Sequence, residues 1–120
     1  MTGADDALSF TEGQDKELDM MISFDHMQAD CFMTDTISTP FNLKKMKSAF
    51  TRWQKKLYGR AWNALYLENH DHPRIISRYG NEKFRNESGK MLATMCYMQS
   101  GTPFIYQGQE IGMLNNHLDS

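Results

Sequence analysis

The stretch LYLENHDHPR, residues 65–74, begins as an apolar run and becomes polar at Glu68. Two other runs behave in the same way: LDMMISF, residues 18–24, is followed by DH, and PFIYQG, residues 103–108, is followed by QE. Each run has the length of a strand and is apolar on successive residues, which is typical of strands whose two sheet faces are both covered. The sequence therefore predicts three parallel strands with polar carboxyl ends, where α/β folds collect ligands and catalytic groups.

Two helical segments are predicted between these runs. Residues 42–58 carry an apolar stripe at steps of three or four positions, and Asn42 can cap its start while Gly59 can end it. Residues 87–99 repeat the pattern. The stripe residues are Leu43, Met46, Phe50, Trp53 and Leu57 in the first segment and Met91, Leu92, Met95 and Cys96 in the second. Helices of this length suit right-handed crossovers between parallel strands, so an α/β architecture is expected.

Charge is distributed unevenly along the chain. The net charge is -2, yet residues 1–30 hold eight Asp or Glu and one Lys, whereas residues 41–60 hold seven Lys or Arg and no acid. The basic block could mark a phosphate-binding surface, but its charges fall between the stripe positions, so a solvated helix face is favoured and no nucleic-acid partner is expected. Residues 1–17 are expected to form a loop or a short helical turn, and a basic loop around Gly80 precedes the second helix.

No apolar run approaches the roughly 18 to 20 residues of a membrane-spanning helix. The N-terminus also lacks a cationic segment followed by an apolar one. We therefore expect a cytoplasmic protein with no membrane partner. Cys31 and Cys96 are neither closely spaced nor numerous, so buried thiols in a reducing compartment are favoured over a zinc site or a disulfide framework.

The HDH triplet at residues 70–72 could supply metal ligands, because imidazole and carboxylate groups suit zinc or iron. On an extended chain, however, His70 and His72 point one way and Asp71 the other. Only two further histidines exist to complete a site, and no metal is expected. The structural alternative is a polar turn over residues 69–71, in which Asp71 caps whatever follows.

Pro73 favours a specific loop conformation, because it restricts His72 to extended angles and keeps Arg74 close to the turn. A carboxylate that lies beside an imidazole and near a guanidinium stays ionised at neutral pH. Such a carboxylate could bind sugar hydroxyls or stabilise a cationic transition state. The residues alone leave both interpretations of Asp71 open, the capping turn and the active-site carboxylate.

Two further features have a structural and a functional interpretation. Gln107 and Glu110 flank Gly108, and bracing a turn there is favoured over a role in a site. Trp53 and Trp62 could stack on sugars, but Trp53 lies on the apolar stripe and is expected in the core.

The runs and their flanks together resemble a known family. ALYLENHDHPRIISRYG, residues 64–80, resembles the fourth signature region of the α-amylase superfamily, in the α-glucosidase branch of oligo-1,6-glucosidases, dextran glucosidases and trehalose-6-phosphate hydrolases. ESGKMLATMCYMQSGTPFIYQGQEIGM, residues 87–113, looks like the segment that follows it there, and KELDMMISFDHM, residues 16–27, looks like the preceding strand. The likeness is collinear over nearly the whole chain, which makes it far more specific than NHD alone.

This resemblance implies a partial (β/α)8 TIM barrel, with the three runs as its sixth, seventh and eighth strands and residues 1–120 as a C-terminal segment of the catalytic barrel domain. Family members are retaining glycosidases, in which an Asp nucleophile and a Glu acid act through an oxocarbenium-like transition state. Asp71 would be the third carboxylate, which stabilises that state, and His70 would hydrogen-bond the same sugar. Asn69 and Arg74 are implied to belong to the substrate site and to orient its loop. No cofactor is implied.

The chain also departs from the family pattern. His72 stands where Gln is frequent and Glu68 where an aromatic residue or Asn is common, so the preference for a leaving group could differ. Gln109 replaces a frequent Glu, which should affect bracing more than chemistry. The nucleophile and the acid have no counterpart in these 120 residues, and neither Glu12 nor Asp25 sits in the required motif.

The sequence thus predicts part of an α-glucosidase that acts on short α-linked gluco-oligosaccharides, with α-1,6 bonds as the expected target. The 120 residues alone are expected to be inactive, to need the remainder of the parent barrel as a partner, and to self-associate through unpaired strand edges. The alternative is a noncatalytic α/β module whose strand-end loops bind sugar or a protein.

Overall fold

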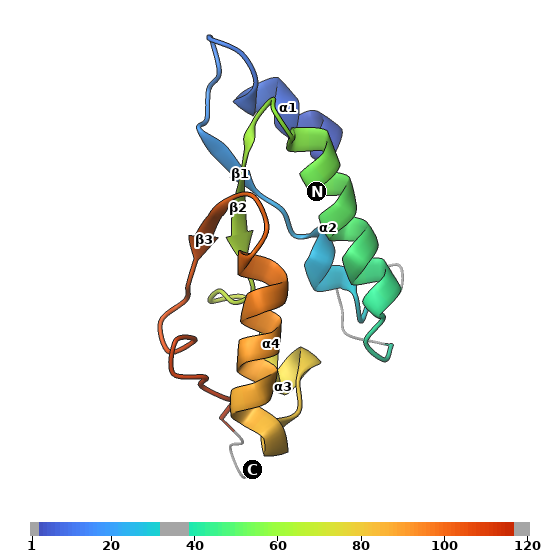
Figure 1. Cartoon of the computed structure of the whole chain (residues 1–120), viewed down its shortest axis with the longest axis vertical. Helices are drawn as coiled ribbons and strands as arrows, with labels where there is room; N and C mark the ends of the chain where they lie inside the picture. The colour runs from blue at the N-terminus through green and yellow to red at the C-terminus, as the bar shows by residue number, and fades with distance from the viewer. Residues whose placement is uncertain (1–2, 32–38, 117–120) are drawn as a thin grey trace. The chain divides into compact units, whose positions relative to one another are not determined.

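The computed structural model describes residues 3–31 and 39–116 (Figure 1). Its helices and strands are α1 (Ala4–Thr11), β1 (Met20–Ile22), α2 (Leu43–Leu57), β2 (Trp62–Tyr66), α3 (Ile75–Tyr79), α4 (Arg85–Tyr97) and β3 (Thr102–Phe104), with short 3-10 turns η1 (Asp25–Gln28) and η2 (Glu82–Phe84). The three strands form one parallel sheet in the order β1-β2-β3, as the sequence predicts. In its register Met20 faces Trp62 and Ile22 faces Ala64. No helix in the described ranges is long and apolar enough to span a membrane.

The chain divides into two compact units. Unit 1 comprises residues 1–64 together with 100–102, and unit 2 comprises residues 65–99 together with 103–120. Both β2 and β3 contribute residues to each unit.

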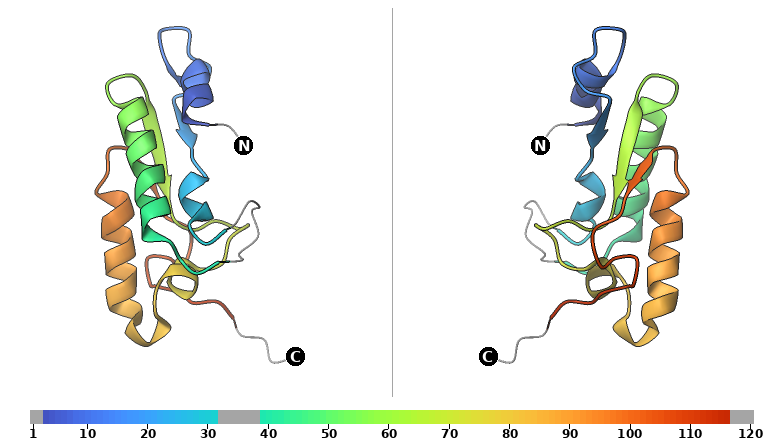
Figure 2. Two further views of the ribbon diagram at one scale, coloured as in Figure 1. Left: turned by 90° about the vertical axis from the view of Figure 1, so that its right-hand side faces the viewer. Right: turned by 90° about the vertical axis from the view of Figure 1, so that its left-hand side faces the viewer.

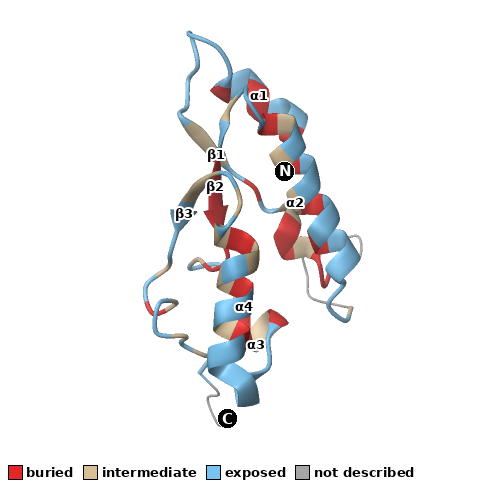
Figure 3. Cartoon of the chain, viewed as in Figure 1, coloured by how far each residue is buried: buried red, intermediate tan, exposed pale blue. Residues whose placement is uncertain are grey.

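In unit 1, α2 forms where the sequence predicts it. The side chain of Asn42 accepts a hydrogen bond from the backbone N–H of Lys45 at 3.1 Å, and the helix ends before Gly59, whose φ of 69° is costly for other residues. The buried face consists of Met46, Ala49, Trp53 and Leu57. Figure 3 shows buried and exposed stretches alternating along α2. Leu43 was predicted on this stripe but is exposed.

The first helix of unit 1 is longer than the short turn that the sequence predicts. Its residues Ala4, Ala7 and Leu8 pack with Trp53 and Leu57 of α2 in one buried cluster. Its start is fixed by the Asp6 carboxylate, which accepts from the backbone N–H of Gly3 at 3.1 Å. An eight-residue helix is marginal by itself, so α1 depends on its packing against α2. Because that packing is not visible in the local sequence, the sequence predicts only a loop or a short turn here.

The acidic and basic segments of unit 1 pair with each other. Arg52 lies 2.5 Å from Asp25, Arg60 lies 2.6 Å from Glu12, and Lys56 contacts Asp5. The four remaining basic residues, Lys44, Lys45, Lys47 and Lys55, are exposed, and the Lys45 ammonium donates to the Cys31 carbonyl at 2.8 Å. The solvated face predicted from the sequence is therefore only part of the basic block, because three of its cations bind the N-terminal acids.

Burial on both sheet faces, which the sequence predicts for all three runs, holds for β2 alone. Its residues from Asn63 to Tyr66 are buried, whereas Ile22 in β1 and Phe104 in β3 are exposed. The third strand is also shorter than predicted. A turn closed by the 2.9 Å hydrogen bond from Gln109 N–H to the Tyr106 carbonyl follows it.

In unit 2, the C-terminal segment runs back along α4 (Figure 2). Tyr97, at the end of α4, donates its hydroxyl to the Phe104 carbonyl at 3.3 Å and accepts from the Gln109 side chain at 2.7 Å. Arg85, at the start of α4, donates to the Ile111 carbonyl at 2.8 Å. The helix begins and ends two residues earlier than predicted.

The sequence predicts a basic loop around Gly80 before α4, but the structure has a short helix, α3, directly before this glycine. It spans Ile75–Tyr79 and buries Ile75, Ile76 and Tyr79. Its end is shaped by Gly80, because a Cβ there would lie 2.8 Å from the Ile76 carbonyl oxygen and 2.9 Å from the Ser88 Cβ. Close packing of α3 against α4 therefore fixes this short helix.

Candidate active site at the end of strand β2

The loop after β2 is a polar turn organised by Asn69. The Asn69 side-chain oxygen accepts from the backbone N–H of Asp71 at 2.9 Å, and the Asn69 carbonyl accepts from the N–H of His72 at 3.4 Å. This geometry is an Asx-turn, in which a short polar side chain replaces a backbone partner. The predicted turn is confirmed, and Asn69 sets the backbone position of Asp71.

Glu68, and not Asp71, caps the helix that follows. The first N–H of α3, from Ile75, donates to Glu68 Oε1 at 2.8 Å, and Arg74 at the N-cap makes no side-chain cap bond. The structural alternative, in which Asp71 caps the following helix, is therefore wrong. Because the turn reverses the chain, the carboxylate nearest the start of α3 comes from the strand end seven residues earlier.

The side chains of His70 and Asp71 are exposed together. His70 Nε2 lies 3.4 Å from Asp71 Oδ2, and the two side chains remain 79% and 69% exposed. A carboxylate in this position can accept hydrogen bonds from sugar hydroxyls or face a developing positive charge. The neighbouring imidazole adds a donor for the same ligand.

His72 lies apart from this pair. Its ring stacks on Tyr66 with centroids 6.3 Å apart and planes inclined at 21°. The predicted alternation, with His70 and His72 on one side and Asp71 on the other, is wrong because the residues form a turn and not an extended strand. Among residues 3–31 and 39–116, no group of three His, Cys, Asp or Glu side chains is placed to hold a metal ion.

Arg74 pairs with Glu68, whereas the sequence predicts it near Asp71. Arg74 Nη1 donates to Glu68 Oε2 at 2.9 Å and to the Gln107 carbonyl at 2.7 Å. The guanidinium carbon lies 5.2 Å above the centroid of the Tyr106 ring. With side chains only 1% and 18% exposed, Glu68 and Arg74 form a largely buried ion pair beneath the exposed loop.

The second strand-end loop, after β3, is braced by Gln109. Its side-chain oxygen accepts from the Tyr106 N–H at 3.2 Å while its amide donates to the Tyr97 hydroxyl. Bracing was predicted for Gln107 and Glu110, but Gln107 offers its backbone carbonyl and Glu110 is exposed. The backbone N–H of Arg74 also reaches this loop, donating to the Asn115 side chain at 2.8 Å.

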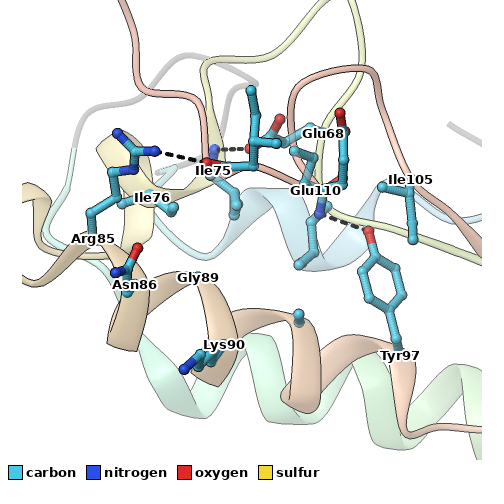
Figure 4. Close-up of a pocket in the computed structure, with 15 residues that line it drawn as sticks. Glu68, Ile75, Ile76, Arg85, Asn86, Gly89, Lys90, Tyr97, Ile105 and Glu110 are labelled. Carbon is cyan, nitrogen blue, oxygen red and sulfur yellow. Dashed lines mark hydrogen bonds between the residues drawn. The ribbon is translucent and has the colours of Figure 1, made fainter.

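Unit 2 contains a cavity of about 350 Å³ below these loops (Figure 4). Arg85 and Tyr97 lie at its two ends, and its walls include Leu67, Ile75, Ile76, Ile105 and Ile111. Glu68 lines it, whereas His70 and Asp71 do not. The exposed pair and the cavity are thus separate features, and the buried Glu68 carboxylate belongs to the cavity wall.

Burial raises the pKa of three groups of unit 2. It raises the pKa of the Cys96 thiol to about 12. The pKa of Tyr66 is also raised, mainly by burial, and that of Tyr97 is raised by burial despite the hydrogen bond from Gln109. All three groups are uncharged near neutral pH even when exposed, and burial moves them further from ionisation.

Asp25 and Glu12, the two carboxylates outside the family's motifs, are both bound within unit 1. Asp25 Oδ2 accepts from Arg52 at 2.5 Å and from the indole N–H of Trp53 at 2.7 Å. Both oxygens of Glu12 accept from Arg60 at 2.6 Å. Trp53 is a core residue as predicted, while Trp62 is half-exposed and donates to Thr102 Oγ1 at 2.9 Å.

Comparison with known proteins places these features in a family. The α-amylase catalytic-domain model matches residues 1–120. The oligo-1,6-glucosidase of Parageobacillus thermoglucosidasius is 46% identical over 112 residues, which are 92% of this chain and 20% of that protein. The trehalose-6-phosphate hydrolase of Bacillus subtilis is 44% identical over 117 residues, which are 95% and 21% of the two chains.

Solved structures agree with the sequence matches. The crystal structure of the trehalose-6-phosphate hydrolase of Bacillus licheniformis superposes with a TM-score of 0.87 at 43% identity, over 95% of this chain and 21% of that one. A trehalulose synthase mutant superposes with a TM-score of 0.88 at 32% identity, over 98% and 22%. The chain spans about a fifth of the length of the relatives that it matches. It belongs to the α-amylase catalytic-domain family, and its parallel strands and helices form part of a (β/α)8 barrel.

Proposed function

We propose that this chain supplies the transition-state-stabilising carboxylate of a retaining glycoside hydrolase that cleaves short α-linked gluco-oligosaccharides. The observation that carries the proposal is the exposed pair of His70 and Asp71 at the carboxyl end of β2, on a turn whose backbone Asn69 holds. Retaining enzymes of this class pass through a transition state with positive charge on the sugar ring. A fixed carboxylate that forms no bond to the ring stabilises that charge.

Each residue of the loop has a distinct role in this proposal. Asp71 faces the developing charge and accepts from sugar hydroxyls, and His70 donates to the same sugar. Asn69 and Arg74 contribute to the substrate site by orienting the loop, and their hydrogen bonds to protein groups support this role. Residues 1–120 act as the C-terminal segment of the catalytic barrel, with β1, β2 and β3 as its sixth, seventh and eighth strands.

The proposed linkage is α-1,6. Several relatives carry the name oligo-1,6-glucosidase, among them those of Parageobacillus thermoglucosidasius, Bacillus cereus and Heyndrickxia coagulans. Two others are named trehalose-6-phosphate hydrolases. Relatives with the same fold therefore act on different substrates, and the α-1,6 linkage needs a test separate from that of the reaction class.

We further propose that the 120 residues alone do not turn over substrate. A retaining glycosidase needs a nucleophile and an acid about 5–5.5 Å apart. Glu12 and Asp25 are occupied by Arg60, Arg52 and Trp53, which supports an acid and a nucleophile supplied by another part of the barrel. Turnover of p-nitrophenyl α-glucoside by the pure chain, abolished by Asp71→Asn, would contradict this.

The proposed partner is the remainder of the barrel. Large apolar side chains of unit 2 are exposed at Met91, Met98, Phe104, Ile105 and Ile111, and their exposure supports association with further barrel segments. Without them, the chain should self-associate. Sedimentation of a monomer at every concentration tested would argue against this expectation.

A graft tests the proposed reaction. The 120 residues replace the matching segment of the Parageobacillus thermoglucosidasius oligo-1,6-glucosidase, and hydrolysis of isomaltose and maltose is measured. We expect activity on isomaltose that Asp71→Asn lowers by about a hundredfold to a thousandfold, because the transition-state charge loses its carboxylate. Asp15→Asn, at an exposed carboxylate of unit 1, is the matched control. Equal rates for the two variants would refute the role of Asp71, and faster cleavage of maltose would refute the linkage alone.

We also propose a cytoplasmic location, supported by two cysteines that are buried as thiols. Recovery of the natural protein in an exported fraction would overturn it.

A further inference from the structure

Glu68 holds both ends of the loop that carries His70 and Asp71. It is the last residue before the loop, and its carboxylate accepts from two groups that follow the loop. These are the backbone N–H of Ile75 at 2.8 Å and the guanidinium of Arg74 at 2.9 Å. A carboxylate that is 1% exposed is costly to desolvate unless it is paired and hydrogen-bonded, and both conditions are met here.

The second strand-end loop is shaped around the same guanidinium. Arg74 donates to the Gln107 carbonyl at 2.7 Å and contacts Met113 Sδ at 3.4 Å. At Gly108, a Cβ would lie 3.1 Å from Arg74 Nη2 and 2.2 Å from Met113 Sδ. The segment 106–113 therefore packs onto Arg74, and Glu68 sets the position of Arg74.

We infer that Glu68 is a positioning residue for Asp71, acting through Arg74 to fix the loop that carries the carboxylate. The inference rests on the proposed function of Asp71. The side chain of Asp71 is exposed and contacts only its neighbour His70 among the interactions described, so its place is set by the backbone of the loop. A displacement of about 1 Å in a catalytic group can cost about a hundredfold in rate, so the anchoring of that backbone matters for catalysis.

The first experiment uses the 120-residue chain itself. Glu68→Gln keeps the size of the side chain and an acceptor oxygen but removes the charge that binds Arg74. Glu110→Gln is the matched control, since Glu110 is an exposed glutamate of the same unit. In Glu68→Gln, amide hydrogen exchange at Asp71, Ile75 and Met113 should accelerate about tenfold or more, because the weaker hold on Arg74 loosens the two loops that contain these N–H groups and their partners. Unchanged exchange at Asp71 and Met113 would overturn the inference.

The second experiment uses the graft and two ligands. Glu68→Gln should weaken binding of protonated 1-deoxynojirimycin about tenfold, since this cation mimics the transition-state charge, but change glucose binding by less than about threefold. A protein that is merely destabilised would bind both ligands more weakly by the same factor, so destabilisation alone would not give this split. Glu68→Asp, which retains the charge, should recover part of the affinity. Equal losses for both ligands would overturn the inference.

A double-mutant cycle tests the route through Arg74. If Glu68 acts through Arg74, the double variant Glu68→Gln with Arg74→Gln should bind the cation about as weakly as Arg74→Gln alone. Additive losses would show that Glu68 acts by another route, contrary to the inference.

Different results would contradict the catalytic role of Asp71 and the positioning role of Glu68. If Asp71→Asn leaves the graft fully active, the proposed function is wrong and the positioning role falls with it. If Asp71→Asn abolishes activity while Glu68→Gln behaves like Glu110→Gln, the proposed function stands and only the inference about Glu68 is overturned.

Discussion

Arg60 binds Glu12 through two parallel hydrogen bonds, with Nε and Nη2 each 2.6 Å from a different carboxylate oxygen. The residues are 48 positions apart and join the end of α2 to the end of α1. Donation from Arg60 holds the pKa of Glu12 below its usual 4.5, and the same bond raises the pKa of Arg60. Lys56 likewise lowers the pKa of Asp5. The acidic N-terminus and the basic helix therefore stabilise each other.

These ion pairs predict that unit 1 loses stability in acid. A carboxylate whose folded pKa is depressed contributes stability above its unfolded pKa and loses it as the pH falls through the folded pKa. Arg60→Gln should therefore lower the midpoint of urea unfolding at ~pH 6 and have a smaller effect at ~pH 2, because the contribution of ionised Glu12 is lost as the pH falls. Far-UV circular dichroism across this range measures the difference.

Lys55→Gln is the control for this prediction, because Lys55 is an exposed cation on the same helix as Lys56. It should leave the midpoint nearly unchanged, since isolated surface charges contribute little to stability. An effect of Arg60→Gln that is the same at both pH values would show that packing, and not charge, is responsible.

The hydrogen bond between Trp53 and Asp25 predicts unequal effects for the two tryptophans. Trp53 is buried and donates to Asp25, so Trp53→Phe should lower the free energy of unfolding by about 2–4 kcal/mol through lost packing and a lost hydrogen bond. Trp62 is half-exposed, and Trp62→Phe should cost less than about 1 kcal/mol. Urea unfolding followed by circular dichroism compares them, and equal costs would contradict the assignment of Trp53 to the core.

Elements with strong local signals could be predicted from sequence. Helix α2 has its apolar stripe, its Asn42 cap and Gly59 at its end, and the structure places it one residue inside the predicted range at each end. Among the described strands, β2 alone has most of its residues buried, as its continuous apolar run predicts.

Elements that depend on tertiary contacts could not be predicted. Helix α1 forms on the face of α2, and α3 is five residues long, so neither shows enough periodicity to be recognised. The cap of α3 comes from Glu68, which lies outside the range in which capping motifs are read from sequence.

The candidate site shows the same division. The position of His70 and Asp71 at a strand end followed from the abrupt polar change after β2. The partner of Arg74 could not be predicted in the same way. Arg74 follows Glu68 by six residues and Asp71 by three, and its guanidinium could pair with either carboxylate. The Asx-turn at Asn69 decides the matter by bringing Arg74 back to Glu68.

The buried thiol of Cys96 should be nearly unreactive in the folded chain. Burial raises its pKa to about 12, and the nucleophile in disulfide exchange is the thiolate. In a Cys31→Ser background at ~pH 8, reaction with Ellman's reagent should be at least about a hundredfold slower in buffer than in urea. A rate in buffer that matches the rate in urea would mean that α4 opens freely.

Gly108 predicts a test of how closely the two strand-end loops pack. Its φ is 86°, and a Cβ there would lie 2.2 Å from Met113 Sδ, whereas Gly13 has a φ of 88° with nothing within 4 Å of a Cβ. Alanine at either position costs about 1 kcal/mol in backbone strain, but only at position 108 must the Met113 and Arg74 side chains also shift, at a further cost of about 1–3 kcal/mol. Hydrogen exchange should therefore show Gly13→Ala loosening its own turn slightly and Gly108→Ala exposing the amides of Gly112 and Met113, which are hydrogen-bonded to Gln109 and Gly108. Equal effects at the two positions would mean that Met113 and Arg74 do not pack against Gly108, and the coupling between the loops would lose its main support.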